Sequence, residues 1–147
     1  MTITARVTIS EFMTPSPHTI GLEQTLEVAH RVMREHQIRH LPVLDSGELV
    51  GMLSLRDLHF IETLDADDPA EVTIEEAMTP DPFVVGPGAL LDTVAREMAE
   101  HKYGSAVVVD KGKVIGVFTT VDALRALAVI LAPRAQPRLH PSNRAKS

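Results

Sequence analysis

The chain has 147 residues, of which 44% are apolar and 3% aromatic, and its net charge is −6. That length suits one compact domain or two half-sized ones, and the apolar content excludes a wholly disordered chain. Because the chain has no cysteine, its composition excludes disulfides, Cys-ligated zinc or iron–sulfur sites, and a thiol nucleophile.

Hydropathy and charge narrow the class of protein further. The longest uninterrupted apolar run, residues 126–132, is far shorter than the roughly 20 residues of a membrane span. The N-terminus also lacks the apolar stretch of a signal peptide, so we expect a cytoplasmic protein with no membrane partner. Residues 133–147 carry four basic side chains and no acid, which leaves −10 for the remaining chain. An acidic body argues against a nucleic-acid partner, and the proline-containing basic tail is expected to be disordered.

An internal repeat is the most informative feature of the sequence. When the sequence is shifted by 65 positions, residues 7–17 align with residues 72–82 without a gap, and the match continues to Asp57 and Asp122. A match of this length predicts a duplicated structural unit. We expect the first copy at residues 7–64 and the second at residues 72–132, joined by an acidic linker over residues 65–71.

The elements of the first copy follow from its patterns, and the second copy predicts the same elements 65 positions later. A capping-box pattern at residues 8–11 predicts a one-turn helix, and a short strand follows near residues 18–20. Apolar residues at helical spacing predict a helix over residues 23–36. Strands at residues 41–44 and 49–53 form a hairpin, which a final helix follows. The predicted fold class is α/β (α+β), with a β-α-β-β-α unit used twice.

A hydroxyl and a carboxylate follow the last strand of each copy. Ser54 and Asp57 stand at the start of the final helix of the first copy, and Thr119 and Asp122 at that of the second. Such a pair can simply cap a helix by satisfying its free backbone donors. It can also bind a ligand, because a carboxylate accepts from both hydroxyls of a ribose and a helix N-terminus attracts an anion. The glycine three positions before each hydroxyl would let that ligand approach the backbone.

With these motifs the chain resembles a tandem pair of CBS domains, the module named after cystathionine beta-synthase. The resemblance covers nearly all of residues 7–131. It rests on the Met-Thr-Pro openings at 13–15 and 78–80, on residues 38–43, and on the glycine-to-aspartate motifs. It implies an intramolecular pair of repeats with two clefts for adenosine-containing ligands: AMP, ADP, ATP, S-adenosylmethionine or NAD.

The resemblance also assigns contacts to individual residues. Ser54 and Asp57 would hold the ribose in one cleft, and Thr119 and Asp122 in the other. Strand residues would sandwich the adenine, and these are Thr19, Ile20, Pro42, Val84 and Val85.

The two copies differ where similar proteins contact phosphate. The first copy has Arg39 and His40, whereas the second has Gly104 and Ser105. In similar proteins these contacts reach across to the ligand held by the other repeat, so Arg39 and His40 are expected to face a phosphate beside Asp122. Arg39 suits phosphate because its planar fork donates two hydrogen bonds. Gly104 and Ser105 would leave the Asp57 cleft nearly neutral. The alternative is a solvated arginine and an ordinary surface histidine.

No catalytic or metal-binding pattern stands out in the sequence. No His-x-x-x-His pair lies within one predicted helix, and no serine has an acid and a histidine at a spacing that predicts a triad. We therefore expect no catalytic residue, no metal and no catalytic cofactor. The adenine nucleotide would be a regulatory ligand, and the module would modulate an unidentified target protein.

The final helix predicts self-association. Residues 121–132 contain only two charges, Asp122 and Arg125, and a helix that is apolar around most of its circumference must bury two faces. We expect a homodimer, which is the commonest closed arrangement. Its contact would include Leu124, Leu127, Ala128 and Leu131. The alternative function is a ligand-independent module that dimerises and docks a partner protein.

Overall fold

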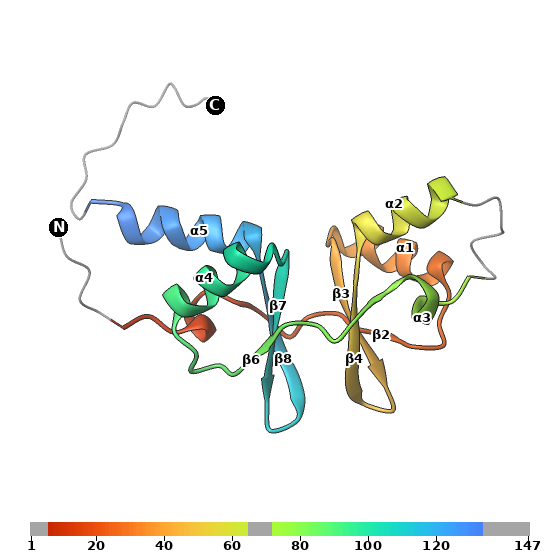
Figure 1. Ribbon diagram of the computed structural model, residues 1–147, viewed down its shortest axis with the longest axis horizontal. Coiled ribbons are helices and arrows are strands. Elements are labelled where there is room, and N and C mark those ends of the chain that lie inside the picture. The colour runs from red at the N-terminus through yellow and green to blue at the C-terminus, as the bar shows by residue number, and fades with distance from the viewer. Residues whose placement is uncertain (1–5, 65–71, 134–147) are drawn as a thin grey trace.

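The computed structural model describes residues 6–64 and 72–133 (Figure 1). The predicted linker over residues 65–71, and the predicted tail except for its first residue, lie outside these described residues. Each repeat has the predicted order of helices and strands. The first repeat contributes η1 (Ile9–Glu11), β1 (Thr14–Pro15), β2 (Ile20–Gly21), α1 (Leu26–His36), β3 (His40–Asp45), β4 (Glu48–Ser54) and α2 (Leu55–Leu64). The second contributes α3 (Ile74–Ala77), β5 (Thr79–Pro80), β6 (Val84–Val85), α4 (Leu91–His101), β7 (Ser105–Asp110), β8 (Lys113–Thr119) and α5 (Thr120–Leu131).

Local sequence signals set the ends of the helices. The side chain of Thr25 accepts a backbone hydrogen bond from the first turn of α1, so the helix begins at Leu26, three residues after the predicted start. It ends where Gln37 adopts a left-handed conformation with φ of 55°. Leu26, Ala29 and Met33 form the buried face of the helix, as the apolar spacing predicted. No helix within residues 6–64 and 72–133 has both the length and the hydropathy that crossing a membrane requires.

The strands form two mixed four-stranded sheets, ordered β2-β3-β4-β5 and β1-β8-β7-β6. The predicted hairpins are present as the antiparallel pairs β3–β4 and β7–β8, and β2 and β6 add in parallel to β3 and β7. The sequence did not predict β1 and β5. Each of these two-residue strands joins the sheet of the other repeat, β1 beside β8 and β5 beside β4. Figure 1 shows the two segments crossing between the halves of the molecule, whose helices lie on the outer sides.

The hydrophobic cores of the two repeats show the same exchange of segments. Ile9 of the first repeat is fully buried in the core of the second, with Phe118, and Ile74 of the second is fully buried in the core of the first, with Leu53. Between the two sheets, Met52 packs in a small buried cluster with two valines, at 107 and 117. The two repeats therefore fold as one interleaved unit rather than as two self-contained domains.

Two glycines make room for the crossing segments. A Cβ at Gly116 would lie 2.3 Å from the sulfur of Met13, and a Cβ at Gly51 would lie 2.3 Å from the sulfur of Met78. These are the glycines that the sequence analysis assigned to close approach of a ligand. The structure corrects that interpretation, because the space beside each glycine is filled by the methionine that opens the other repeat's Met-Thr-Pro segment.

Candidate functional site

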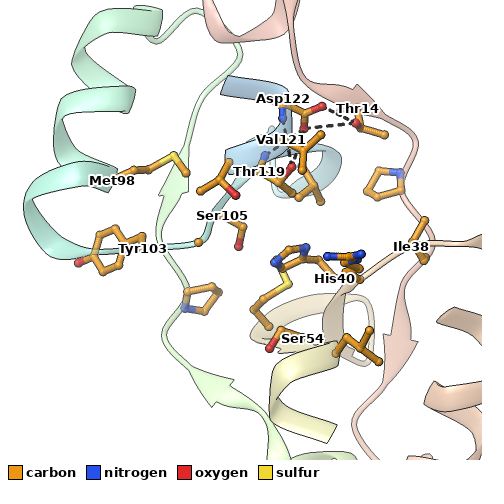
Figure 2. A pocket seen from close by; sticks show the side chains of 18 of the residues that line it. Thr14, Ile38, His40, Ser54, Met98, Tyr103, Ser105, Thr119, Val121 and Asp122 are labelled. Carbon is orange, nitrogen blue, oxygen red and sulfur yellow. Dashed lines mark hydrogen bonds between the residues drawn. The ribbon is translucent and has the colours of Figure 1, made fainter. Parts of the chain in front are cut away.

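One continuous cleft of about 1910 Å³ runs between the repeats at the N-terminal ends of α2 and α5 (Figure 2). Its lining includes eight of the thirteen residues that the sequence singled out as ligand contacts. They are Arg39, His40, Ser54, Asp57, Gly104, Ser105, Thr119 and Asp122. The two predicted hydroxyl–carboxylate pairs thus face a shared space.

The predicted adenine contacts do not line this cleft. They are Thr19, Ile20, Pro42, Val84 and Val85. β2 starts two residues and β6 one residue later than predicted, and the two strands pair with β3 and β7. Val84 is exposed outside the cleft. Ile20 and Pro42 are buried in the protein. The crossing segments before those strands line the cleft instead. In the first segment these are residues 14–18, and in the second they are Thr79 and residues 81–83.

Thr119 and Asp122 form a complete capping box at the start of α5. The backbone N–H of Thr119 donates to Oδ2 of Asp122 at 2.9 Å, and the backbone N–H of Asp122 donates to Oγ1 of Thr119 at 3.4 Å. The structural interpretation of this pair is therefore correct. Asp122 is only 3% exposed, which is uncommon for a carboxylate unless it has partners.

Asp122 has two further partners that the sequence analysis missed. Oγ1 of Thr14, from the crossing segment, donates to Oδ1 of Asp122 at 3.1 Å, and Nη1 of Arg125 donates to the same oxygen at 2.9 Å. Figure 2 shows Thr14 and Asp122 facing each other across the end of the cleft. The Arg125 contact is one helical turn away and could have been found from its i, i+3 spacing. The Thr14 contact depends on the strand exchange, which has no local signal.

Ser54 and Asp57 repeat the capping geometry in a more open setting. The backbone N–H of Ser54 donates to Oδ2 of Asp57 at 2.8 Å, and the backbone N–H of Asp57 donates to Oγ of Ser54 at 3.0 Å. Both side chains are half-buried. Within residues 6–64 and 72–133, Oδ1 of Asp57 accepts no hydrogen bond from a side chain, in contrast to Oδ1 of Asp122.

His40 lies between the two carboxylates. Its Nε2 is 4.0 Å from the position that a Cβ on Gly104 would take, which is an ordinary van der Waals separation, so the ring of His40 lies close to Gly104 of the other repeat. Burial lowers the pKa of His40, and the neighbouring Arg39 lowers it as well, while the charges of Asp57 and Asp122 raise it. Both acids act on the same imidazole, which places His40 near the centre of the cleft, as Figure 2 shows.

The cleft has two halves that correspond under the 65-residue shift. By that shift we assign residues 14–18, Ile38, Arg39, Thr119 and Asp122 to the Asp122 half, and Thr79, residues 81–83, Tyr103, Gly104, Ser54 and Asp57 to the Asp57 half. The hydrogen bond between Thr14 and Asp122 supports this pairing of the crossing segment with the opposite repeat.

Charged and aromatic side chains line the cleft beside the helix N-termini. Arg56 and Lys102 line it together with Asp57 and Asp81, so these charges balance and the nearly neutral Asp57 half stays a prediction. In the same half the rings of Phe83 and Tyr103 lie 5.0 Å apart, and the His101 ring stacks on Tyr103 at 5.1 Å. In the Asp122 half, the ring of His18 instead stacks on that of His36, with centroids 3.7 Å apart.

The described residues offer no metal centre. Over residues 6–64 and 72–133, no group of three or more histidine, aspartate or glutamate side chains is arranged to hold a metal ion. The chemistry available in the cleft is therefore that of hydroxyls, carboxylates, exposed cations, one central imidazole and two helix N-termini.

Comparison with known proteins gives the same picture of two similar units. A family model described as CBS domain matches residues 9–63 and 74–129. The inosine-5'-monophosphate dehydrogenase of Korarchaeum cryptofilum is 35% identical over 105 residues, which make up 71% of this chain. The matched chain spans only 21% of the length of that enzyme.

Two solved structures resemble nearly the whole molecule. CBSX2 from Arabidopsis thaliana, solved in complex with AMP, is 28% identical with a TM-score of 0.76, and the match covers 86% of this chain and 99% of CBSX2. The CBS domain pair of protein MJ0100, solved with 5'-methylthioadenosine and S-adenosyl-L-methionine, is 25% identical with a TM-score of 0.77. That match covers 85% of this chain and 98% of the MJ0100 chain.

Proposed function

Since the chain belongs to the CBS-domain family as a tandem pair of the module, we propose that it is a regulatory, non-catalytic sensor of an adenosine-containing ligand. The ligand would bind in the cleft between the repeats and change the affinity of the module for a target protein. The observation that carries this proposal is the pair of hydroxyl–carboxylate motifs, Ser54 with Asp57 and Thr119 with Asp122, which line one cleft at two helix N-termini.

The chemistry of these motifs suits a nucleoside. Each carboxylate can accept hydrogen bonds from the two hydroxyls of a ribose, and the N–H groups at the start of α2 and α5 favour an anion. Asp57 lines the cleft, and its Oδ1 accepts no hydrogen bond from a side chain among the described residues. At Asp122 the ribose would replace the hydroxyl of Thr14, which is itself exposed.

The ligands of the relatives support the adenosine class. AMP is bound in the CBSX2 structure, and 5'-methylthioadenosine and S-adenosyl-L-methionine are bound in that of MJ0100. For this chain we propose AMP, ADP or ATP as the ligand of the Asp122 half, because Arg39 and His40 line the cleft and the CBS resemblance directs them to a phosphate beside Asp122. A guanidinium binds phosphate through two parallel hydrogen bonds. S-adenosylmethionine and NAD remain candidates for the cleft as a whole.

Self-association is the second part of the proposal. On α5 the exposed apolar side chains include Leu124 at 65%, Leu127 at 53% and Leu131 at 61%, and Ala128 is exposed beside them. Phe60 on α2 is also exposed, at 59%. An apolar surface of this kind typically marks an interface, and we propose that two copies of the chain pack along α5 as a homodimer.

A panel of ligands tests the proposed function. The melting temperature of the full chain is measured with AMP, ADP, ATP, S-adenosylmethionine, 5'-methylthioadenosine and NAD, with GTP and ribose 5-phosphate as controls. A ligand that binds only the folded state stabilises it by about 2.7 kcal/mol at a concentration 100 times its dissociation constant. We expect at least one adenosine compound to raise the melting temperature in proportion to the logarithm of its concentration. If none does so while the chain remains dimeric, the ligand-independent docking module is the better description.

A further inference from the structure

Methionine supplies all the sulfur of this chain, which has six methionines and no cysteine. Five of the six lie within the described residues. Met33, Met52 and Met98 are buried, with exposed fractions of 3%, 7% and 4%. Met13 and Met78, which open the two Met-Thr-Pro segments, are only half-buried. Because oxidants react faster with accessible side chains, a peroxide should reach these two sulfur atoms first.

Both of these sulfur atoms pack directly against a glycine of the opposite repeat. Met13 packs on the core of the second repeat, and Met78 packs on the core of the first. A Cβ added at Gly116 would overlap the sulfur of Met13 and lie 3.1 Å from its terminal methyl group. A Cβ added at Gly51 would overlap the sulfur of Met78. Each thioether thus fixes a crossing segment to the sheet that the segment joins.

The crossing strands themselves are short and exposed. β1 and β5 have two residues each, and all four residues are exposed. The backbone N–H of Ser16 donates to the carbonyl of Ile115 at 3.0 Å, and the hydroxyl of Thr14 donates to Asp122. Segments with so few buried contacts open locally at a low cost in free energy. Loss of the methionine contact should therefore release a crossing segment before the rest of the fold opens.

From these contacts we propose that Met13 and Met78 form a peroxide-sensitive pair, whose conversion to methionine sulfoxide loosens the two crossing segments. The sulfur lone pair attacks one oxygen of hydrogen peroxide, and an S–O bond forms as the O–O bond breaks. The other oxygen takes up the proton and leaves as water, so sulfur is oxidised and the peroxide is reduced. The product carries a polar oxygen on an atom that is packed against glycine backbone at the edge of a core, where a polar group is unfavourable. Oxidation would weaken the junction between the repeats at both crossings, whether or not the cleft holds a ligand.

Limited treatment of the full chain with hydrogen peroxide tests this proposal. Peptide mapping by mass spectrometry follows the gain of one oxygen atom at each methionine. We expect Met13 and Met78 to be oxidised about fivefold faster than the three buried methionines, in line with their exposure. Once both are oxidised, the melting temperature should fall by about 5 °C. Treatment with methionine sulfoxide reductases, which return the sulfoxide to the thioether, should restore it.

Two pairs of variants separate this response from general oxidative damage. Met13→Leu with Met78→Leu keeps apolar side chains of similar volume but removes both sulfur atoms, so peroxide should no longer lower the melting temperature. Met33→Leu with Met98→Leu is the matched control, because these two methionines are also related by the 65-residue shift but are buried on α1 and α4. The control pair should keep the full response. Circular dichroism before treatment confirms that both variants are folded.

Hydrogen exchange shows where the oxidised protein opens. The amide of Ser16 should exchange about threefold faster or more after oxidation, while the amides of the central strand β7 stay protected. Equal oxidation rates at all five methionines would overturn the proposal. An unchanged melting temperature after complete oxidation of Met13 and Met78, or a full response in the variant that lacks both sulfur atoms, would overturn it as well.

Discussion

Oγ1 of Thr14 donates a hydrogen bond to Oδ1 of Asp122 at 3.1 Å, although 108 positions separate the two residues. The contact joins β1, the crossing strand of the first repeat, to the first turn of α5, the last helix of the second repeat. Any ligand that engages Asp122 therefore also acts on the segment that ties the two sheets together.

Thr14→Val should remove this link with little change in shape. Because Thr14 is exposed and Asp122 keeps its bonds to Thr119 and Arg125, we expect a loss of about 1 kcal/mol in the free energy of unfolding, within the usual range for one hydrogen bond. Urea titration measures it. Thr14→Ser, which keeps the hydroxyl, should restore most of the loss. A loss in Thr14→Ser with none in Thr14→Val would show that the methyl contacts, rather than the hydrogen bond, stabilise the segment.

The two carboxylates should differ in their effect on a phosphorylated ligand. Asp122→Ala is expected to remove most AMP binding, because the proposal places the phosphate between Arg39 and the Asp122 end of the cleft, whereas Asp57→Ala should keep at least half of the affinity. Arg39→Ala should weaken AMP far more than adenosine, since a hydrogen bond to a charged group contributes about 1.5–3 kcal/mol. Calorimetric titration of each variant measures these affinities, and equal losses from the two aspartate substitutions would contradict the asymmetry.

His40 should make stability depend on pH. Burial lowers its pKa below the ordinary value of 6.5, so between that value and the lowered one the unfolded chain binds a proton that the folded chain does not. Stability should then fall as the pH drops below about 6.5 and the slope should end once the folded state also titrates. Urea unfolding from pH 5 to 7.5 measures this dependence. His40→Gln should flatten it, and an unchanged slope in that variant would assign the effect to other histidines.

The same lowered pKa changes the expected pH dependence of ligand binding. A phosphate contact from a His40 with the ordinary pKa of about 6.5 would make AMP affinity fall as the pH rises through that value. Because burial lowers the pKa of His40 in the folded protein, we expect AMP affinity to increase at a pH below 6.5. In that range a bound phosphate favours the protonated form of the imidazole. Calorimetry at pH 5.5 and 7.5 measures this change, and His40→Gln should abolish it.

The exposed apolar side chains of α5 predict the oligomeric state. Leu124→Glu with Leu127→Glu should convert a dimer into a monomer at tens of micromolar chain, as measured by light scattering. Val84→Glu is the matched control, because Val84 is also an exposed apolar residue, at 46%, but lies on β6. A monomeric parent protein, or a dimer that survives the α5 substitutions, would contradict the proposed interface.

Gly51 and Gly116 should differ in how much an added side chain lowers the free energy of unfolding. At Gly116 a new Cβ meets only the flexible Met13 side chain, whereas at Gly51 it also lies 3.0 Å from the backbone oxygen of Thr79. We expect Gly51→Ala to lower the free energy of unfolding by about 1–3 kcal/mol, as overpacking does, and Gly116→Ala to lower it by less. Thermal unfolding measures both, and a larger loss at Gly116 would contradict the role given to the backbone oxygen.

Local patterns predicted most of the fold. The apolar run at residues 106–109 and the turn at 110–112 predict the position of the β7–β8 hairpin to within a few residues. The buried face of α4 follows from the spacing of its apolar residues. The exchange of β1 and β5 could not be predicted in this way, because a two-residue strand has no periodicity and its partner lies about a hundred residues away in the case of Thr14 and Val117.

The candidate site likewise contains residues that local sequence patterns predicted and residues that they did not. The capping pairs of the site were visible because each spans three residues. The residues of the crossing segments and of α4 were not, since their presence in the cleft depends on where the two repeats meet. Thr14, Phe83 and Met98 belong to this second group.

The interleaving of the repeats also bears on how the chain is made. Thr14 is synthesised about a hundred residues before its strand partner Val117. Ile9 has no core to enter until the second repeat has been made, so the second sheet cannot be completed before then. A pause or a premature stop after the first repeat would leave the Met13 segment without its partner and β4 without the edge strand that residues 79–80 provide. A single repeat would therefore expose an unpaired sheet edge and apolar side chains, and these are the features that make incomplete chains prone to aggregate.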